Sequence, residues 1–80
     1  MRYVLFTKDN CPYCEKAENL LEKHEKNFKV VNFEEGQEDI LQKIKDSCKW
    51  KTVPMIFEVS NNTEINFIGG FTDLSNSLEE

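Results

Sequence analysis

The chain has 80 residues, of which 39% are hydrophobic and 31% charged, and its net charge at pH 7 is -5. This size and composition predict a single folded domain over residues 1–80 and exclude a disordered tail. The acidic balance argues against a nucleic-acid-binding protein, which normally presents a basic face. A membrane-spanning helix is not expected either, because no apolar run approaches the roughly 20 residues that one needs.

The N-terminus and the cysteines bear on where the protein works. Residues 1–7 lack a long apolar segment and a small-residue cleavage site, so we interpret them as a strand and not as a signal peptide. The three cysteines are Cys11, Cys14 and Cys48. An odd number without a secretory signal argues against a structural disulfide framework. We therefore expect a cytoplasmic protein whose closely spaced cysteine pair serves redox chemistry or metal binding. The net charge of -5 and the lack of a large exposed apolar run make a monomer the default expectation.

The first half of the chain predicts a strand–helix–strand unit. Residues 2–7 are apolar without alternation, which is typical of a strand buried on both faces. Apolar residues at helical spacing predict a helix over about 12–25, with Pro12 as its first residue and Cys11 as its N-cap. Residues 28–33 predict a second strand. Because a helical crossover joins them, the two strands should be parallel.

The second half predicts a further helix and a hairpin. Spacing favours a helix over about 37–48, followed by a strand over 53–59. Pro54 should mark a strand end or a special loop, because proline cannot donate a ladder hydrogen bond inside a central strand. A turn at 60–63 and alternating residues at 64–68 then predict a strand that pairs back.

A short last helix completes the chain. Two glycines at 69–70 break the strand, Thr72 is predicted as an N-cap, and Asp73 stands in the first turn. Leu74 and Leu78, four residues apart, provide the apolar side of this helix. The predicted order is therefore β-α-β-α-β-β-α, an α/β domain without an internal repeat or linker.

The position of Cys11 predicts a reactive thiol. A cysteine at a helix N-terminus faces unpaired backbone N–H groups and the positive end of the helix dipole, and both favour its thiolate. The thiolate is the form that attacks disulfides, and Lys8 adds a nearby positive charge. Cys14 lies one turn into the helix and should be more buried. We therefore assign Cys11 as the nucleophile and Cys14 as the resolving thiol.

A structural zinc site is the alternative for this pair. Such a site usually needs four ligands, and the remaining candidates are Cys48 and His24. His24 is expected about 15 Å further along the same helix, at about 1.5 Å per residue, so it cannot share a metal with Cys11. A Cys-x-x-Cys pair beside a β-α-β unit favours redox chemistry, and no metal ligands are assigned.

Three motifs together resemble one family. Cys11-Pro12-Tyr13-Cys14, Thr52-Val53-Pro54 and 69–73 (Gly-Gly-Phe-Thr-Asp) stand in the order and spacing of a dithiol glutaredoxin. This resemblance covers essentially the whole chain. It implies the thioredoxin-like fold, a four-stranded mixed sheet flanked by helices, with strand order 2-1-3-4 and the third strand antiparallel to the first.

The resemblance also implies roles for individual residues. Cys11 would form a mixed disulfide with glutathione, Cys14 would resolve protein disulfides, and Pro54 would follow a cis peptide bond. Glutathione would be a co-substrate, with no permanently bound cofactor. The residues that would contact glutathione are Lys8, Tyr13, Lys51, Thr52, Val53, Pro54, Gly70, Thr72 and Asp73.

One segment departs from the family pattern. The run Cys48-Lys49-Trp50-Lys51 stands where a glycine-containing loop is expected before Thr52. Within this run, Cys48 is interpreted as a small residue at the end of a helix face. Trp50 either contacts partner proteins or caps the core.

Three functions remain open from the sequence. The first is a glutathione-dependent reductase of protein disulfides and glutathione mixed disulfides, with disulfide-containing clients among which ribonucleotide reductase is a candidate. The second is a redoxin of the same fold that takes electrons from a thioredoxin-reductase-type flavoprotein. The third is a binding module that holds an iron–sulfur cluster through Cys11 and glutathione. The presence of Lys8, Thr72 and Asp73 together favours the first.

Overall fold

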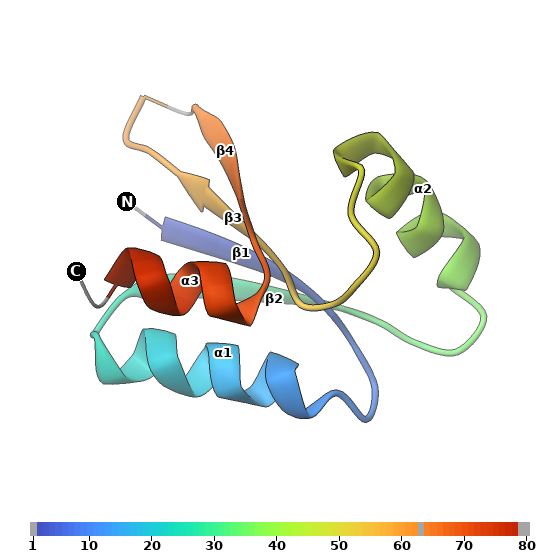
Figure 1. Ribbon diagram of the computed structural model, residues 1–80, viewed down its shortest axis with the longest axis horizontal. Helices are drawn as coiled ribbons and strands as arrows, with labels where there is room; N and C mark the ends of the chain where they lie inside the picture. Colours follow the sequence, from blue (N-terminus) through green and yellow to red (C-terminus); the bar gives the residue numbers. More distant parts are fainter. Residues whose placement is uncertain (1, 63, 79–80) are drawn as a thin grey trace.

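A mixed four-stranded sheet carries three helices in the computed structural model, which describes residues 2–62 and 64–78 (Figure 1). In chain order the elements are β1 (Arg2–Lys8), α1 (Pro12–Lys23), β2 (Asn27–Phe33), α2 (Glu38–Cys48), β3 (Met55–Val59), β4 (Ile65–Gly69) and α3 (Phe71–Leu78). The strand order is β2-β1-β3-β4, with β1 parallel to β2 and antiparallel to β3. The predicted element order and topology are confirmed. Thr63 of the predicted turn lies outside the described residues.

One face of the sheet is covered by α1 and α3, which lie side by side (Figure 1). The apolar stripe of α1, residues Ala17, Leu20 and Leu21, packs into a core with Leu5 of β1 and Leu74 of α3. Each fully buried leucine of this kind contributes roughly 1.5–3 kcal/mol relative to an exposed one. The stripe predicted from helical spacing therefore fixes α1 against the sheet and, with it, the position of its N-terminus.

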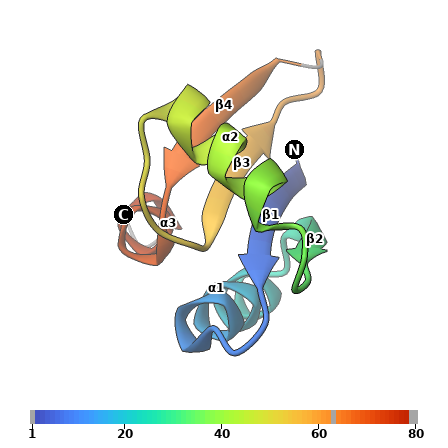
Figure 2. The same ribbon diagram turned by 90° about the vertical axis from the view of Figure 1, so that its right-hand side faces the viewer.

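The strand β1 is less buried than the sequence predicted. Its fully buried residues alternate as Tyr3, Leu5 and Thr7, whereas Val4 and Phe6 are half-buried. The expectation that both faces would be buried is wrong, because α1 and α3 cover one face and α2 lies apart from them near the end of β2 (Figure 2).

A row of aromatic rings lines the less covered face. Phe6 of β1 contacts Phe33 and Phe57 at ring-centroid distances of 5.6 and 5.3 Å. Phe57 contacts Phe67 of β4 at 5.0 Å, and Phe67 in turn contacts Trp50 at 5.3 Å. The row therefore runs from β2 across the sheet to the loop between α2 and β3.

Tyr3 lies at the opposite end of β1 from the cysteines. Its hydroxyl donates a hydrogen bond of 3.3 Å to Glu58 Oε2 on the neighbouring strand β3. Burial, together with the adjacent Glu58 carboxylate, raises the pKa of Tyr3 above its ordinary value. None of the helices in residues 2–62 and 64–78 is long and apolar enough to cross a bilayer.

The first two helices end in the same way, each with a non-glycine residue in the left-handed conformation. After α1, which ends at Lys23 with His24 as its C-cap, Glu25 has φ 57° and Lys26 N–H donates to Leu21 O. After α2, Lys49 has φ 55° and Trp50 N–H donates to Lys45 O. These are the bonds of a Schellman motif, whose left-handed residue is usually glycine. Lys49 thus adopts the backbone conformation that the missing glycine would supply.

The start of α3 differs from the prediction. The first helical hydrogen bond runs from Leu74 N–H to Gly70 O, so the helix begins at Phe71 and Thr72 is its second residue, not its N-cap. The reason is Asp73, whose Oδ2 accepts a 3.0 Å hydrogen bond from Gly70 N–H. A carboxylate at the third helical position that reaches back in this way is half of a capping box, and it sets the helix start one turn before itself.

Candidate active site

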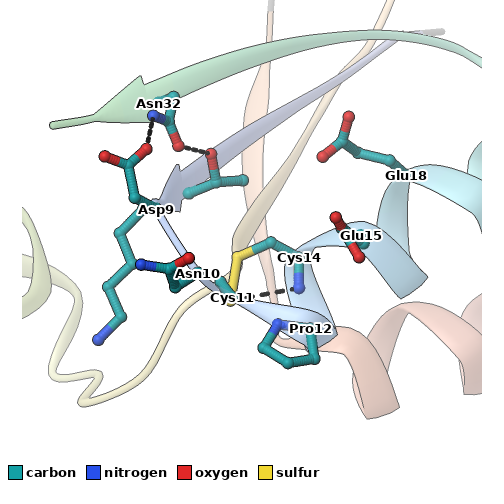
Figure 3. A pocket seen from close by; sticks show the side chains of 10 residues that line it. Asp9, Asn10, Cys11, Pro12, Cys14, Glu15, Glu18 and Asn32 are labelled. Carbon is teal, nitrogen blue, oxygen red and sulfur yellow. Dashed lines mark hydrogen bonds between the residues drawn. A yellow bond between two sulfur atoms is a disulfide. The ribbon is translucent and has the colours of Figure 1, made fainter.

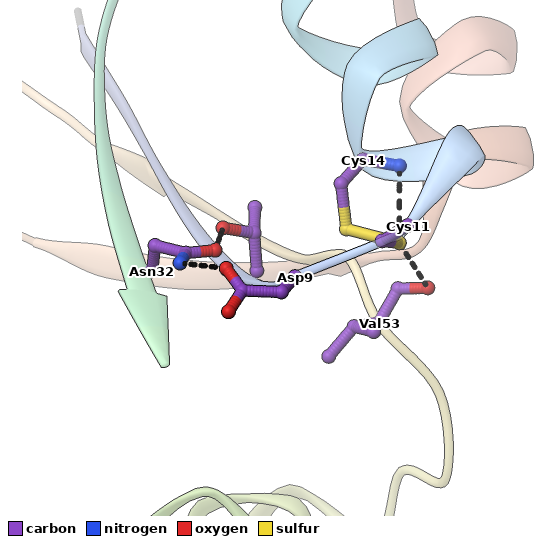
Figure 4. Close-up of a disulfide and its surroundings, with 6 residues drawn as sticks. Asp9, Cys11, Cys14, Asn32 and Val53 are labelled. Carbon is purple, nitrogen blue, oxygen red and sulfur yellow. Dashed lines mark hydrogen bonds between the residues drawn. A yellow bond between two sulfur atoms is a disulfide. The ribbon is translucent and has the colours of Figure 1, made fainter. Parts of the chain in front are cut away.

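The two closely spaced cysteines form a disulfide at the N-terminus of α1 (Figure 4). Cys11 is the N-cap with extended backbone (φ -119°, ψ 96°), and Pro12 is the first helical residue, as predicted. The Cα atoms of Cys11 and Cys14 are 5.2 Å apart, within the ordinary range for a disulfide. Cys14 N–H donates to Cys11 Sγ at 3.3 Å.

The two sulfurs are in different surroundings. Cys11 is partly exposed, whereas Cys14 is buried, with 3% of its surface accessible. When the disulfide is reduced, the N–H groups at the start of α1 and the helix dipole favour the thiolate of Cys11. Cys11 is therefore the sulfur that an external thiolate or disulfide can reach, and Cys14 is the sulfur that stays behind it.

The loop before β3 borders the disulfide. The Val53–Pro54 peptide bond is cis, as the resemblance implied, and Pro54 is buried. The carbonyl oxygen of Val53 lies 3.9 Å from Cys11 Sγ, which places the backbone of this loop directly beside the reactive sulfur (Figure 4).

A groove of about 310 Å³ lies between this loop and the start of α3. Three aromatic residues are part of its walls: Tyr13 and Phe71 are in contact at a tilt of 43° with ring centroids 6.0 Å apart, and Trp50 also lines the groove. The residues that line this aromatic groove are Tyr13, Trp50, Thr52, Val53, Pro54, Gly70, Phe71, Thr72 and Asp73.

A larger cleft of about 460 Å³ is bordered by both Cys11 and Cys14 (Figure 3). Three carboxylates border this acidic cleft, from Asp9, Glu15 and Glu18, together with the single cation Lys8 among its lining residues. The lining residues are Thr7, Lys8, Asp9, Asn10, Cys11, Pro12, Cys14, Glu15, Glu18 and Asn32.

Hydrogen bonds between β1 and β2 fix one side of the acidic cleft. Thr7 Oγ1 donates to Asn32 Oδ1 at 2.8 Å, and Asn32 Nδ2 donates to Asp9 Oδ1 at 2.8 Å. Because Thr7 is buried in β1, this chain of bonds holds the Asp9 carboxylate at the mouth of the cleft.

The predicted glutathione contacts fall into two groups. Most of them line the aromatic groove, namely Tyr13, Thr52, Val53, Pro54, Gly70, Thr72 and Asp73. Lys8 borders the acidic cleft instead, and Lys51 lines an adjoining hollow that shares Trp50 and Thr52 with the groove.

The sequence did not assign Trp50 and Phe71 to the groove. Phe71 directly follows Gly70, which was assigned, and Trp50 lies two residues before Thr52. Their proximity to those motifs is the signal that could have assigned both of them.

The zinc alternative finds no ligand set in the described part of the chain. No group of three or more His, Cys, Asp and Glu side chains is placed there to hold a metal ion. His24 is the C-cap of α1, at the opposite end of the helix from Cys11. Cys48 is a half-buried free thiol at the last residue of α2.

The fold and the disulfide define the class of the protein. A mixed sheet of order β2-β1-β3-β4, a Cys-x-x-Cys pair at the start of α1 and a cis-proline before β3 make it a thioredoxin-like protein with a redox-active cysteine pair. The match of residues 3–62 to the family model Glutaredoxin is more specific. The chain belongs to the glutaredoxin family, whose members are thiol–disulfide oxidoreductases.

Solved glutaredoxin structures superpose on most of the chain. Glutaredoxin 1 from Francisella tularensis, complexed with cacodylate, gives a TM-score of 0.73 at 24% identity, covering 98% of this chain and 92% of that one; this likeness concerns the fold alone. Glutaredoxin from Brucella melitensis gives 0.74 at 25% identity, covering 99% and 78%. The dithiolic glutaredoxin 2-C-Grx1 from Trypanosoma brucei brucei gives 0.72 at 35% identity, covering 94% and 74%.

A curated relative agrees with the family assignment. Glutaredoxin-2 from Schizosaccharomyces pombe is 34% identical over 74 residues, which is 90% of this chain. The chain spans 63% of the length of that relative.

Proposed function

We propose that this protein is a glutathione-dependent oxidoreductase that reduces protein disulfides and glutathione mixed disulfides. The observation that supports this most is the partly exposed Cys11 sulfur at the N-terminus of α1, directly beside a groove of about 310 Å³. The sulfur provides the chemistry, and the groove provides room for a peptide-sized thiol next to it.

The reaction on a protein disulfide begins with the reduced protein. The Cys11 thiolate attacks one client sulfur, and the other client sulfur leaves and takes up a proton. The Cys14 thiolate then attacks Cys11 Sγ, which releases the second client thiol and forms the Cys11–Cys14 disulfide seen in the structure.

Two glutathione molecules restore the reduced protein. The first glutathione thiolate attacks Cys11 Sγ, and Cys14 leaves and is protonated. The second attacks the glutathione sulfur of this mixed disulfide, which yields glutathione disulfide and the Cys11 thiolate. The two electrons that reduce the client thus come from the two glutathione thiols.

The groove has features that suit glutathione. The exposed backbone of Val53, beside Cys11 Sγ, can pair with the cysteinyl part of the tripeptide as a short added strand. The N-terminus of α3 can accept the carboxylate of the γ-glutamyl end, and Asp73, held there by its hydrogen bond with Gly70, can take the ammonium group. We assign Thr72 to the same end of the ligand.

A coupled assay tests this proposal. Glutathione, glutathione reductase and NADPH are combined with the protein and a small glutathione mixed disulfide, and NADPH consumption is followed. We expect turnover that saturates with the mixed disulfide. If the protein gives no rate above the uncatalysed exchange, the proposal is wrong, and thioredoxin reductase should then be tried as the electron donor.

Three finer points are part of the proposal; the first two rest on the sequence alone, and the third rests on the family resemblance. They are a monomeric state, a cytoplasmic location and ribonucleotide reductase as a candidate client. Reduction of oxidised ribonucleotide reductase by this protein with glutathione, compared with glutathione alone, tests the last of them.

A further inference from the structure

Trp50 stands where the aromatic row of the sheet meets the groove. Its ring packs edge-on against Phe67, with centroids 5.3 Å apart and an interplanar angle of 81°. On the other side, its Cζ2 lies 3.7 Å from the position that a Cβ on Gly70 would occupy. Phe67 therefore holds the indole from behind while its far edge borders the groove at Gly70.

We propose that Trp50 is a specificity-determining residue of this site, forming the wall against which the γ-glutamyl arm of glutathione packs. This inference rests on the proposed function. The inference adds a residue that recognises one particular arm of the ligand. It also answers whether Trp50 serves the core or a partner, because Phe67 fixes the indole where it can contact the ligand.

The course of the ligand follows from the chemistry. The ligand sulfur must reach Cys11 Sγ, which lies 3.9 Å from the Val53 carbonyl oxygen at one end of the groove. The polar groups that suit an ammonium and a carboxylate lie at the other end, at Asp73 and the start of α3. An arm that connects these two ends passes Gly70, and the Trp50 edge lies next to Gly70.

The walls of the groove explain why an aliphatic arm fits. Trp50 borders one side, and the contacting rings of Tyr13 and Phe71 border the groove as well. Aromatic walls bury methylene groups well. The γ-glutamyl arm has two methylene groups, which suit the aromatic walls. Beyond them it has an ammonium and a carboxylate group, which suit Asp73 and the start of α3.

The single tryptophan of the chain provides a direct test. In a Cys14→Ser variant, Cys11 is converted to a mixed disulfide with either γ-glutamylcysteine or cysteinylglycine, two dipeptides that carry opposite arms of glutathione. We expect the γ-glutamylcysteine adduct to change the Trp50 emission and the cysteinylglycine adduct to leave it as in the 2-mercaptoethanol adduct. Equal emission from all three adducts would overturn the inference.

Kinetics provide a second test. Trp50→Leu should raise the KM for mixed disulfides of glutathione and γ-glutamylcysteine by about three- to tenfold, as expected for lost contact with two methylene groups. The KM for the cysteinylglycine mixed disulfide should not change, and Trp50→Phe should restore most of the loss. Ile40→Ala, at an exposed position on α2, is the matched control.

These outcomes separate the two proposals. Failure of the wild-type protein to turn over the glutathione mixed disulfide would remove the proposed function. If the wild type turns over normally and Trp50→Leu has the wild-type KM for every substrate, the role of Trp50 is overturned and the proposed function stands. Because Trp50 also packs on Phe67, Trp50→Leu is interpreted only if its circular dichroism and melting match those of the wild type. The emission test needs no change at position 50.

Discussion

The two sides of the disulfide differ in shape and in charge. On the Cys11 side lies the aromatic groove, bordered by Trp50, Tyr13 and Phe71. The acidic cleft borders both Cys11 and Cys14, and three carboxylates and one lysine are among its lining residues. The difference in charge implies that anionic glutathione favours the aromatic groove, where the Val53 carbonyl oxygen lies 3.9 Å from Cys11 Sγ.

Replacing each cysteine tests this difference with the largest expected effect. Cys11→Ser should reduce both activities, on glutathione mixed disulfides and on protein disulfides, to the uncatalysed rate, because it removes the sulfur that faces the groove. Cys14→Ser should keep turnover of the mixed disulfide, which needs only Cys11, and should lose reduction of a protein disulfide. The coupled NADPH assay measures the first activity, and reduction of a model protein disulfide measures the second.

The control is the free cysteine Cys48, whose replacement by serine should change neither activity. Equal loss of both activities in Cys14→Ser would contradict the assigned roles. So would residual mixed-disulfide turnover in Cys11→Ser, since it would mean that Cys14 reacts from the acidic cleft.

The Asp73 side of the groove should be sensitive to a single methyl group at the neighbouring Gly69. This glycine has φ +124°, and a Cβ there would collide with the Asp73 carboxylate. Gly69→Ala should therefore lower the free energy of unfolding by roughly 1–3 kcal/mol and displace Asp73 from Gly70 N–H, which raises the KM for glutathione mixed disulfides. Urea denaturation and the coupled assay measure the two effects.

Gly36→Ala provides the matched control away from the groove. Gly36 also has a positive φ, +97°, but nothing lies within 4 Å of the position its Cβ would take. It should lose stability by about 1–2 kcal/mol through backbone strain, with an unchanged KM. A KM that rises equally in both variants would show that lost stability, and not Asp73, controls binding.

Charge at the groove should have a smaller effect. Lys51 is exposed in the hollow that adjoins the groove, and glutathione carries a net negative charge. Lys51→Gln should raise the KM about two- to threefold at low salt, and the difference should vanish at high ionic strength, where charges beyond a few ångströms are screened. Lys43→Gln, on an exposed position of α2, is the control. An increase that persists at high salt would indicate a direct contact instead of steering.

The sequence predicted the parts of this site that depend on local chemistry. The N-cap position of Cys11 follows from Pro12 and from the apolar stripe of α1, and the structure has both. The cis bond before Pro54 came from the resemblance and is also present. Such features are set by residues close together in the chain.

Features that depend on which side chains meet across the fold were not predicted. Thr72 was expected to cap α3, but Asp73 reaches back to Gly70 and shifts the helix start. Trp50 is close to Thr52 in the chain, but its orientation at the groove is fixed by Phe67 from another strand. The acidic cleft likewise depends on Asn32 of β2, which orients Asp9 from outside the motif. Spacing along the chain carries no signal for such contacts.

The smallest expected effect concerns the turn that leads into the groove. Lys49 and Glu25 follow α2 and α1 in the same left-handed conformation, with φ 55° and 57°. Replacement by glycine at either position removes the strain of a Cβ in this conformation, but it also gives the unfolded chain more conformational freedom. Because the strain is the larger effect, each replacement should raise the free energy of unfolding by roughly 0.5–1 kcal/mol. For a domain of this size that corresponds to about 3–6 °C in melting temperature.

The two glycine variants compare a helix end beside the groove with one away from it. The bond from Trp50 N–H to Lys45 O should persist in Lys49→Gly, so Trp50 keeps its place and the KM at high salt should not change. Glu25→Gly should show the same gain in stability and the same unchanged KM as Lys49→Gly. A higher KM in Lys49→Gly alone, at equal or greater stability, would mean that the lysine side chain and not only its backbone helps to hold the Trp50 wall. A fall in stability in either variant would contradict the strain argument, because the side chain would then contribute more than its backbone conformation costs.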